Sequence, residues 1–213
     1  MKKSACIEMM FTEVPFEERF FLAKEAGFHY IEFWSWKDKD IAKIKSLCEK
    51  YDLKIASFSG DQDFSMVHQE ENEAYIDFVV ESIKIAIFLD CKYLVLHSNA
   101  LGEGGMVVNA FHEINPNEKF ANMIHSKYIK ILYDVYHMQV NEGNIIDSIT
   151  RYIKSIGYIH VADVPGRNEP GTGEINYKNV MERLRQLDYD GIVGFELFPS
   201  RTSMKVAGEL LAL

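Results

Sequence analysis

Three apolar segments in the second half of the chain each end in a side chain that can bind a metal ion or move a proton. These end residues are Asp134, His160 and Glu196. A helical pattern follows each segment, so we expect three strands of a parallel barrel whose ends meet at the mouth, where such folds build active sites. Carboxylate oxygens and one imidazole suit Mn²⁺ or Mg²⁺, and suit Co²⁺ or Zn²⁺ less specifically. The sequence therefore predicts a divalent-metal site.

Each of these side chains also has an ordinary structural explanation when it is considered alone. Asp134 could cap a turn, His160 could be a hydrogen-bonded core histidine, and Glu196 could form an ion pair. However, a charged group at the end of a barrel strand is costly to desolvate unless a partner or a metal compensates. Three such groups in successive units therefore favour one shared ligand.

Three further residues are expected to contact a substrate. His137 follows the Asp134 strand and is predicted to lie on the loop above it, although a supporting or surface role is the alternative. Arg167 lies in a Gly- and Pro-rich loop, 164–174, and offers a two-pronged donor for a carboxylate or a pair of hydroxyls. His97 ends an earlier strand and is a weaker candidate. The remaining histidines are expected to be structural or on the surface: His29, His68, His112 and His125.

The elements that would position these side chains alternate along the chain. Strands are predicted at about 5–11, 30–34, 54–58, 93–97, 129–134, 158–160 and 191–196. The helical spacing of apolar residues predicts helices at about 15–27, 38–51, 70–89, 118–124, 144–153, 176–187 and from 203 onward. This alternation indicates βαβ units and a parallel sheet.

We therefore predict an α/β fold of the (β/α)₈ TIM-barrel type that is incomplete, because only about seven strands are recognisable. The irregular stretch at 101–117 lies where the eighth strand should be. A doubly wound open sheet is the alternative fold. It is less favoured because no Gly-rich phosphate loop follows the first strand.

Length and composition indicate one globular domain spanning 1–213. The formal net charge of −9 and the dispersed Lys and Arg residues argue against a nucleic-acid partner. The three cysteines, Cys6, Cys48 and Cys91, are too far apart in sequence for a metal or redox motif, so we expect reduced, mostly buried thiols. No apolar run is long enough to span a membrane and no signal peptide is recognisable, so a cytoplasmic location is expected.

Several segments resemble the hydroxypyruvate isomerase group of the xylose isomerase-like sugar isomerase/epimerase superfamily of TIM barrels. They are 10–20, 132–139, 159–167 and 169–177. The resemblance covers nearly the whole chain except the irregular stretch, and the motif at 158–177 is specific.

The resemblance implies a divalent metal held by four side chains from four strands, of which Asp134, His160 and Glu196 carry over. The fourth, a glutamate on the fifth strand, cannot be found. In the family, two metal-bound glutamates exchange a proton with the substrate carbon beside the carbonyl, and Glu196 is present for one of these roles. Glu103 or Glu113 could replace the other, but their Gly-rich surroundings would position them poorly.

The main hypothesis is a metal-dependent isomerase acting on a small hydroxy-keto acid or sugar through an enediolate. A ketose 3-epimerase would use the same chemistry. The alternative from another class is an impaired barrel that binds metal or sugar without turnover. We also expect a homodimer or larger assembly, because a missing strand of the barrel would expose apolar surface.

Overall fold

The structure, a computed structural model, describes residues 1–213 apart from 62–63, 67 and 98–127. The chain divides into two compact units, so the single domain expected over 1–213 stays a prediction. The first unit combines Met1–Glu32, Leu47–Lys54 and Lys130–Leu213, and the second combines Phe33–Ser46 and Ile55–Ile129.

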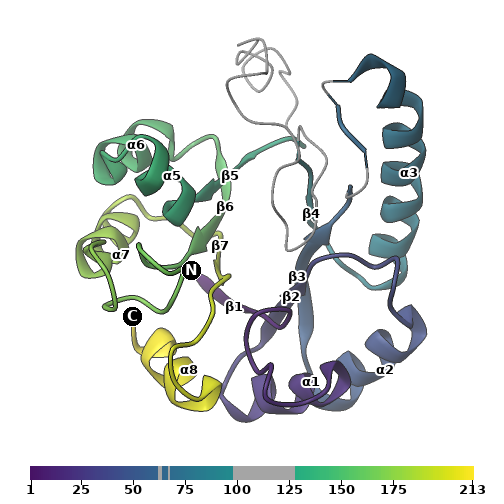
Figure 1. The fold of residues 1–213 in the computed structure, drawn as a ribbon, viewed down its shortest axis with the longest axis horizontal. Helices are drawn as coiled ribbons and strands as arrows, with labels where there is room; N and C mark the ends of the chain where they lie inside the picture. Colours follow the sequence, from purple (N-terminus) through teal and green to yellow (C-terminus); the bar gives the residue numbers. More distant parts are fainter. Residues whose placement is uncertain (62–63, 67, 98–127) are drawn as a thin grey trace. The chain divides into compact units, whose positions relative to one another are not determined.

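A parallel sheet forms the centre of the first unit, with the strand order β2-β1-β7-β6-β5 (Figure 1). The strands are β1 (Lys2–Cys6), β2 (Tyr30–Phe33), β5 (Ile131–Asp134), β6 (Ile156–Val161) and β7 (Ile192–Phe195). Ser4 of β1 is in register with Tyr30 of β2 and with Gly194 of β7, so β1 joins the early and late parts of the chain. Strands of a parallel sheet are covered on both faces, which explains why β6 and β7 are buried over nearly their whole length.

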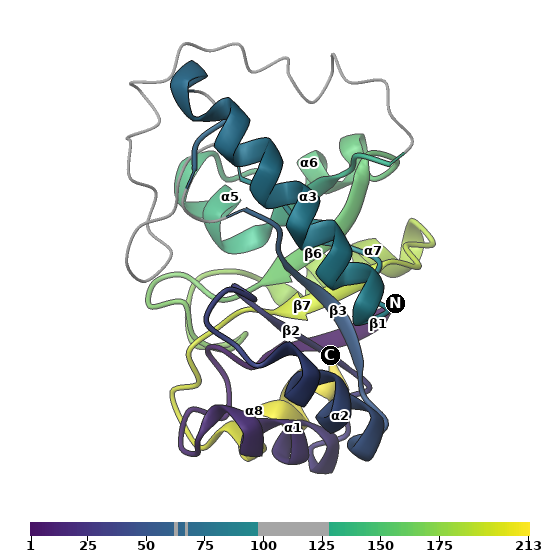
Figure 2. The same ribbon diagram turned by 90° about the vertical axis from the view of Figure 1, so that its right-hand side faces the viewer.

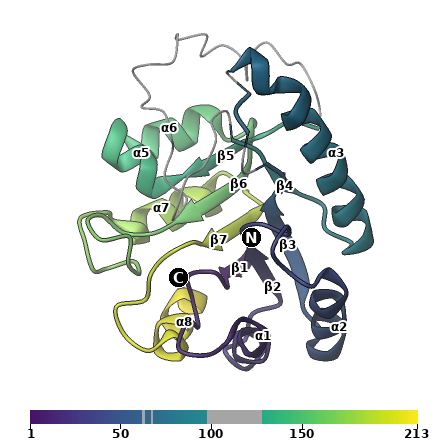
Figure 3. The ribbon, with the colours of Figure 1, turned by 45° about the vertical axis from the view of Figure 1, so that its right-hand side comes forward.

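Helices follow these strands in the order expected for βαβ units. They are α1 (Phe16–Glu25) after β1, α5 (Val135–Asn141) and α6 (Ile145–Tyr152) after β5, α7 (Tyr177–Gln186) after β6, and α8 (Ser203–Ala212) after β7. In α6, Ile145 and Ile149 are buried whereas Asp147 and Arg151 are exposed, as expected for a helix with one face on the core. Figure 3 shows β5, β6 and β7 side by side, with α7 close to β6.

Large apolar side chains fill the core of the first unit. Ile31, Ile159 and Val193, from three different strands, are fully buried. The rings of Phe28 and Phe195 meet edge to face with their centroids 6.2 Å apart. This packing fixes the strands whose ends carry the charged residues.

The second unit contains β3 (Lys54–Ser59) and β4 (Leu94–Val95), which pair in parallel. A short 3₁₀ turn, Gln69–Glu71, leads into the long helix α3 (Asn72–Phe88), which Figure 2 shows along its length. The helix α2 (Ile41–Tyr51) divides its residues between the two units.

The indole of Trp36 packs against α3 within the second unit. Its ring stacks on Phe78 with a centroid distance of 5.3 Å, and its Nε1 donates a hydrogen bond of 2.7 Å to Ser82 Oγ. Ser82 Oγ in turn donates to the carbonyl of Gly60, which follows β3. The single N–H donor of this partly buried indole is thus hydrogen-bonded.

The described residues of the two units together contain seven strands, and every strand pair within a unit is parallel, in agreement with the predicted alternation. The cysteines are buried and not linked by disulfides, as expected. No helix in the described part of the chain is long and apolar enough to cross a membrane. The predicted helix at 118–124, the stretch 101–117 with Glu103 and Glu113, and the histidines at 112 and 125 lie outside the described residues.

The strand predicted at 5–11 is wrong beyond Cys6. The backbone N–H groups of Met9 and Met10 both donate to the Cys6 carbonyl, and Phe11 has a left-handed φ of 61°. The apolar residues after Cys6 therefore form a buried turn, because a continuous apolar sequence does not distinguish a buried strand from a buried turn.

Two details of the helices go beyond their predicted ranges. In α3, Ile83 and Ile87 are exposed, whereas Tyr75 and Ala86 are buried. Asn144 precedes α6 but forms no cap through its side chain, and its backbone is left-handed with φ 53°.

Candidate functional site

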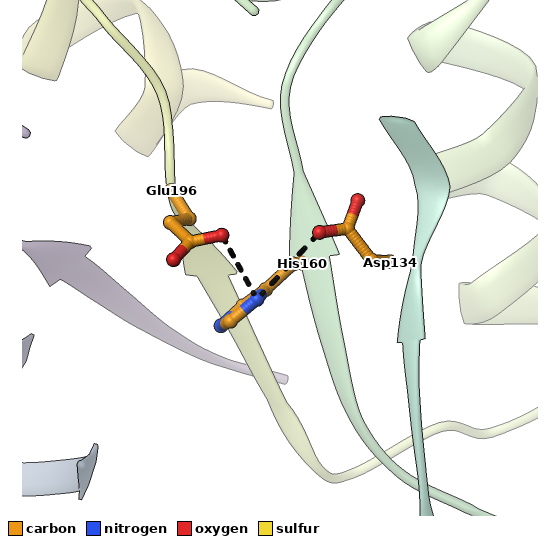
Figure 4. Close-up of side chains that lie close together, drawn as sticks. All are labelled: Asp134, His160 and Glu196. Carbon is orange, nitrogen blue, oxygen red and sulfur yellow. Dashed lines mark ion pairs between the residues drawn. The ribbon is translucent and has the colours of Figure 1, made fainter. Parts of the chain in front are cut away.

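Three neighbouring strands bring the predicted charged residues together at one edge of the sheet. Asp134 at the end of β5 is in register with His160 of β6, and His160 is in register with Gly194 of β7. Glu196 comes two residues after Gly194, immediately beyond the end of β7. Figure 4 shows the Asp134 and Glu196 carboxylates on either side of the His160 imidazole.

The three side chains form a compact cluster that could hold a metal ion. His160 Nδ1 lies 3.9 Å from Asp134 Oδ2 and 3.5 Å from Glu196 Oε2. One possible ligand atom from each residue lies within 4.8 Å of the others. All three side chains are at most 13% exposed, so their charges are poorly solvated and favour a shared partner.

Arg167 supplies a positive charge to this cluster. Its Nη2 donates a hydrogen bond to Glu196 Oε2 and lies 3.9 Å from Asp134 Oδ2. Its guanidinium also lies over the ring of Tyr136, 5.6 Å from the centroid. The structure thus brings Arg167 to the cluster of Asp134, His160 and Glu196, where its guanidinium lies beside both carboxylates.

A third carboxylate, that of Glu32 in β2, lies beside the other ring nitrogen of His160 and was missed in the sequence. Glu32 Oε1 is 3.3 Å from His160 Nε2, and the Tyr158 hydroxyl donates to Glu32 Oε2. Burial alone would lower the pKa of His160, but the charges of Glu32, Glu196 and Asp134 outweigh it and raise the pKa to about 9. A signal was available, since Glu32 is the one charged residue in the segment Tyr30–Phe33.

His137 does not lie on a loop, as was predicted, but in the first turn of α5. The His137 backbone N–H donates a 3.1 Å hydrogen bond to Asp134 Oδ1, so the carboxylate that ends β5 also caps the helix. The prediction failed because this cap lets the helix begin directly after the strand. The half-exposed imidazole places Nε2 3.7 Å from Asp134 Oδ2, at the rim of the cluster.

Asp163 organises the loop that carries Arg167. Its fully buried carboxylate accepts four backbone N–H groups at 2.8–3.0 Å, from Val164, Gly171, Gly173 and Ile175. A Cβ at Gly173 would lie 2.0 Å from the Val164 carbonyl oxygen, so only glycine fits there. The Gly and Pro residues of the sequence indicated a tight loop, but not the carboxylate at its centre.

Glu169 ties the same loop to the segment before α8. Its buried carboxylate accepts hydrogen bonds from the backbone N–H and the hydroxyl of Ser200 and from the guanidinium of Arg201. Burial by itself would raise the pKa of Glu169, but these hydrogen bonds outweigh it and lower the pKa from 4.5 to about 2. The loop is therefore held at two points by buried carboxylates.

This contact predicts a specific loss of stability in acid. Because the folded-state pKa of Glu169 is below its ordinary value, its stabilisation is complete above pH 4.5 and is lost as the pH falls toward about 2. We expect Glu169→Gln to cost about 3 kcal/mol of unfolding free energy at pH 7, and much less at pH 2.5. Urea unfolding at both pH values measures the difference. The same change at the exposed Glu182 is the control, and an equal Glu169→Gln effect at both pH values would contradict the assignment.

His97 belongs to the second unit and lies beside the buried carboxylate of Asp61. Asp61 Oδ2 accepts a 2.5 Å hydrogen bond from the His97 backbone N–H, and Oδ1 lies 3.1 Å from His97 Nδ1. The Tyr75 hydroxyl donates to the His97 carbonyl at 3.1 Å. The role of His97 as a substrate contact stays a prediction.

The sequence profile of one protein family, described as xylose isomerase-like TIM barrel, matches the chain over residues 20–113 and 103–212. The chain belongs to this xylose isomerase-like TIM barrel family. The incomplete (β/α)₈ barrel predicted from the sequence is thereby confirmed, together with the parallel strands of the structure.

Two isomerases are similar to this member of the xylose isomerase-like family. A 2-oxo-tetronate isomerase from Haemophilus influenzae is 25% identical over 242 aligned residues, which cover 93% of each chain. A hydroxypyruvate isomerase from Escherichia coli is 27% identical over an alignment of 247 positions, which covers 95% of this chain and 95% of that protein. Both alignments are longer than the 213 residues of the chain, so both contain gaps in the sequence of this chain. These relatives confirm the predicted resemblance and support an isomerase.

Solved structures of the same architecture are also similar. A protein from Brucella melitensis described as AP endonuclease, family 2, superposes with a TM-score of 0.83 at 24% identity, covering 99% of this chain and 98% of that one. A D-allulose 3-epimerase from Methylomonas sp. gives a TM-score of 0.79 at 20% identity, covering 100% and 96%. Identities this low show the fold alone, which is that of the xylose isomerase-like barrels.

Proposed function

We propose that this protein is a metal-dependent isomerase that acts on a small hydroxy-keto acid or sugar by proton transfer through an enediolate. The observation that carries the proposal is the cluster of Asp134, His160 and Glu196 at the ends of three adjacent strands. Related proteins named as isomerases of small oxo acids support the choice of substrate class.

The residues present fit a divalent cation. Asp134 Oδ2, His160 Nδ1 and Glu196 Oε2 face one another, and both carboxylates already lie beside the Arg167 guanidinium. Two carboxylate oxygens and one imidazole nitrogen suit Mn²⁺ or Mg²⁺, with Co²⁺ and Zn²⁺ as alternatives. Such an ion, when bound, would polarise the substrate carbonyl and make the adjacent C–H bond more acidic.

The side chains of the cluster have separate roles in this proposal. Glu196 removes a proton from the carbon beside the carbonyl and is the general base. Arg167 binds a substrate oxygen and opposes the negative charge that develops there. His137, at the rim, binds a second substrate oxygen, and His97 is the further substrate contact.

Exchange of substrate protons with solvent tests the proposal directly. Chelator-treated protein is incubated in D₂O with hydroxypyruvate, with and without Mn²⁺, and the methylene signal is followed by proton NMR. We expect that signal to disappear only when Mn²⁺ is present. No exchange with hydroxypyruvate, but metal-dependent exchange at C3 of D-allulose, would favour a ketose 3-epimerase, for which the solved epimerases give fold-level support. Metal binding without exchange of either compound would indicate a barrel without turnover.

Metal binding itself is expected to depend on Asp134. Asp134→Asn keeps an oxygen that can cap α5 but removes the charge that faces His160, so we expect the Mn²⁺ affinity to fall at least about 100-fold. Isothermal titration calorimetry measures the affinity. Asp190→Asn removes the same charge from an exposed position and is the matched control. Equal affinities for Asp134→Asn and wild type would show that the cluster is not the metal site.

A further inference from the structure

We propose that Glu32 is a positioning residue for His160 and holds the imidazole so that Nδ1 faces Asp134 and Glu196. This inference rests on the proposed function, because the orientation matters most if Nδ1 binds a metal ion. Glu32 comes from β2, near the start of the chain, and none of the roles assigned above includes it.

The two ring nitrogens of His160 point to different partners. Nδ1 lies 3.5 Å from Glu196 Oε2 and 3.9 Å from Asp134 Oδ2. Nε2 lies 3.3 Å from Glu32 Oε1. The two nitrogens point in different directions, so the imidazole ring stands between Glu32 and the carboxylates of Asp134 and Glu196. It is therefore suited to orient the histidine and not to act as a fourth ligand.

The contact between Glu32 and His160 is exclusive on both sides. Oε1 and Nε2 are both buried and lie 3.3 Å apart, and within the described residues neither has a well-aligned hydrogen bond. A buried carboxylate oxygen and a buried ring nitrogen without partners are costly, so each is the natural partner of the other. Small movements of either side chain would align the hydrogen bond.

Tyr158 fixes the carboxylate from its other end. Its hydroxyl donates to Glu32 Oε2, and its ring packs edge to face on the His160 ring with centroids 5.3 Å apart. Tyr158 and His160 lie on the same face of β6, two residues apart. One strand therefore carries both the histidine and the group that holds its partner.

Gly194 provides the space for this contact. A Cβ at this position would lie 2.7 Å from both carboxylate oxygens of Glu32 and 2.9 Å from His160 Cδ2. Gly194 is in register with His160 on β6, so any side chain there would stand between the two partners. The glycine is explained by this close approach and not by an unusual backbone angle.

The chemistry of imidazole connects this geometry to metal binding. A neutral histidine has one N–H, and a carboxylate that accepts it at Nε2 leaves the lone pair of Nδ1 available to a cation. The same hydrogen bond restricts rotation of the ring. Glu32 thus selects both the tautomer and the direction in which His160 presents its ligand atom.

Glu32→Gln tests this role, with Mn²⁺ affinity from calorimetry as the first measurement. We expect the affinity to fall about 10–100-fold while the protein remains folded by circular dichroism. Tyr158→Phe leaves the carboxylate in place but unanchored, and we expect a smaller loss. In the Zn²⁺-loaded wild type, the His160 Nε2 proton should give a downfield NMR resonance, which should move upfield in Glu32→Gln.

Glu17→Gln makes the same chemical change on the exposed side of α1 and is the matched control, with wild-type affinity expected. Wild-type affinity in Glu32→Gln would overturn the inference and leave the proposed metal site intact. Absence of Mn²⁺ binding in the wild-type protein would overturn the metal site and this inference together. If Glu32→Gln does not fold, Tyr158→Phe decides, because an unchanged affinity there would overturn the role of the carboxylate.

Discussion

Replacing Glu196 with Gln is expected to reduce exchange of the substrate α-proton with solvent about 1,000-fold at saturating Mn²⁺. Gln keeps the size of the side chain and an oxygen that can bind a cation, but it cannot accept a proton from carbon. Glu196 lies beside His160 Nδ1 and Arg167, where a substrate carbonyl would also bind. The variant therefore separates proton transfer from metal binding at one position.

The exchange rate in D₂O, followed by NMR at several Mn²⁺ concentrations, is the appropriate measurement. Glu182→Gln, on the exposed surface of α7, provides the matched control and should exchange at the wild-type rate. If Glu196→Gln exchanged the proton as fast as wild type, another base would carry the reaction and the enzymatic role of Glu196 would be wrong. Restored exchange only at high Mn²⁺ would instead indicate a binding defect.

Asp163→Asn is expected to destabilise the first unit by about 3 kcal/mol, although the two side chains have the same shape. Oδ1 accepts N–H groups from Val164 and Ile175, and Oδ2 accepts those of Gly171 and Gly173. The amide group of Asn is a donor, so in either orientation two backbone donors would face another donor. The loop would then rearrange, and Arg167 would lose its fixed position beside Glu196.

Urea unfolding of the two proteins measures the stability, and the α-proton exchange assay measures the effect on Arg167. We expect the exchange rate to fall as well, even under conditions in which Asp163→Asn is fully folded. The same substitution at the exposed Asp190 should change neither quantity. A stable Asp163→Asn variant would mean that the four hydrogen bonds contribute little to the loop.

Much of the site could be predicted because its residues follow one rule. Asp134, His160 and Glu196 each come at or near the end of an apolar segment, and parallel strands place such ends at one edge of a sheet. Arg167 could also be predicted, since the loop that follows a strand at this edge returns over the cluster.

The residues that were missed or misplaced are those whose role depends on contacts that only the folded chain makes. Glu32 lies on β2, and no local pattern shows that β2, β1 and β7 would bring it to His160. Asp163 and Glu169 looked like ordinary loop residues, because the backbone N–H groups they accept become visible only when the loop is folded. His137 was placed on a loop because the sequence does not show that Asp134 caps a helix at once.

The hydrogen bond between Tyr158 and Glu32 joins residues that are 126 positions apart. Contacts of such long range form late in folding, because a large loop must close before they add any stability. His160 can be held in its final orientation only after β1 has paired with both β2 and β7. During synthesis, a chain whose last strand has not yet been made therefore has Asp134 and His160 but no ordered cluster. High-affinity uptake of a cation would accordingly report that the first unit has finished folding.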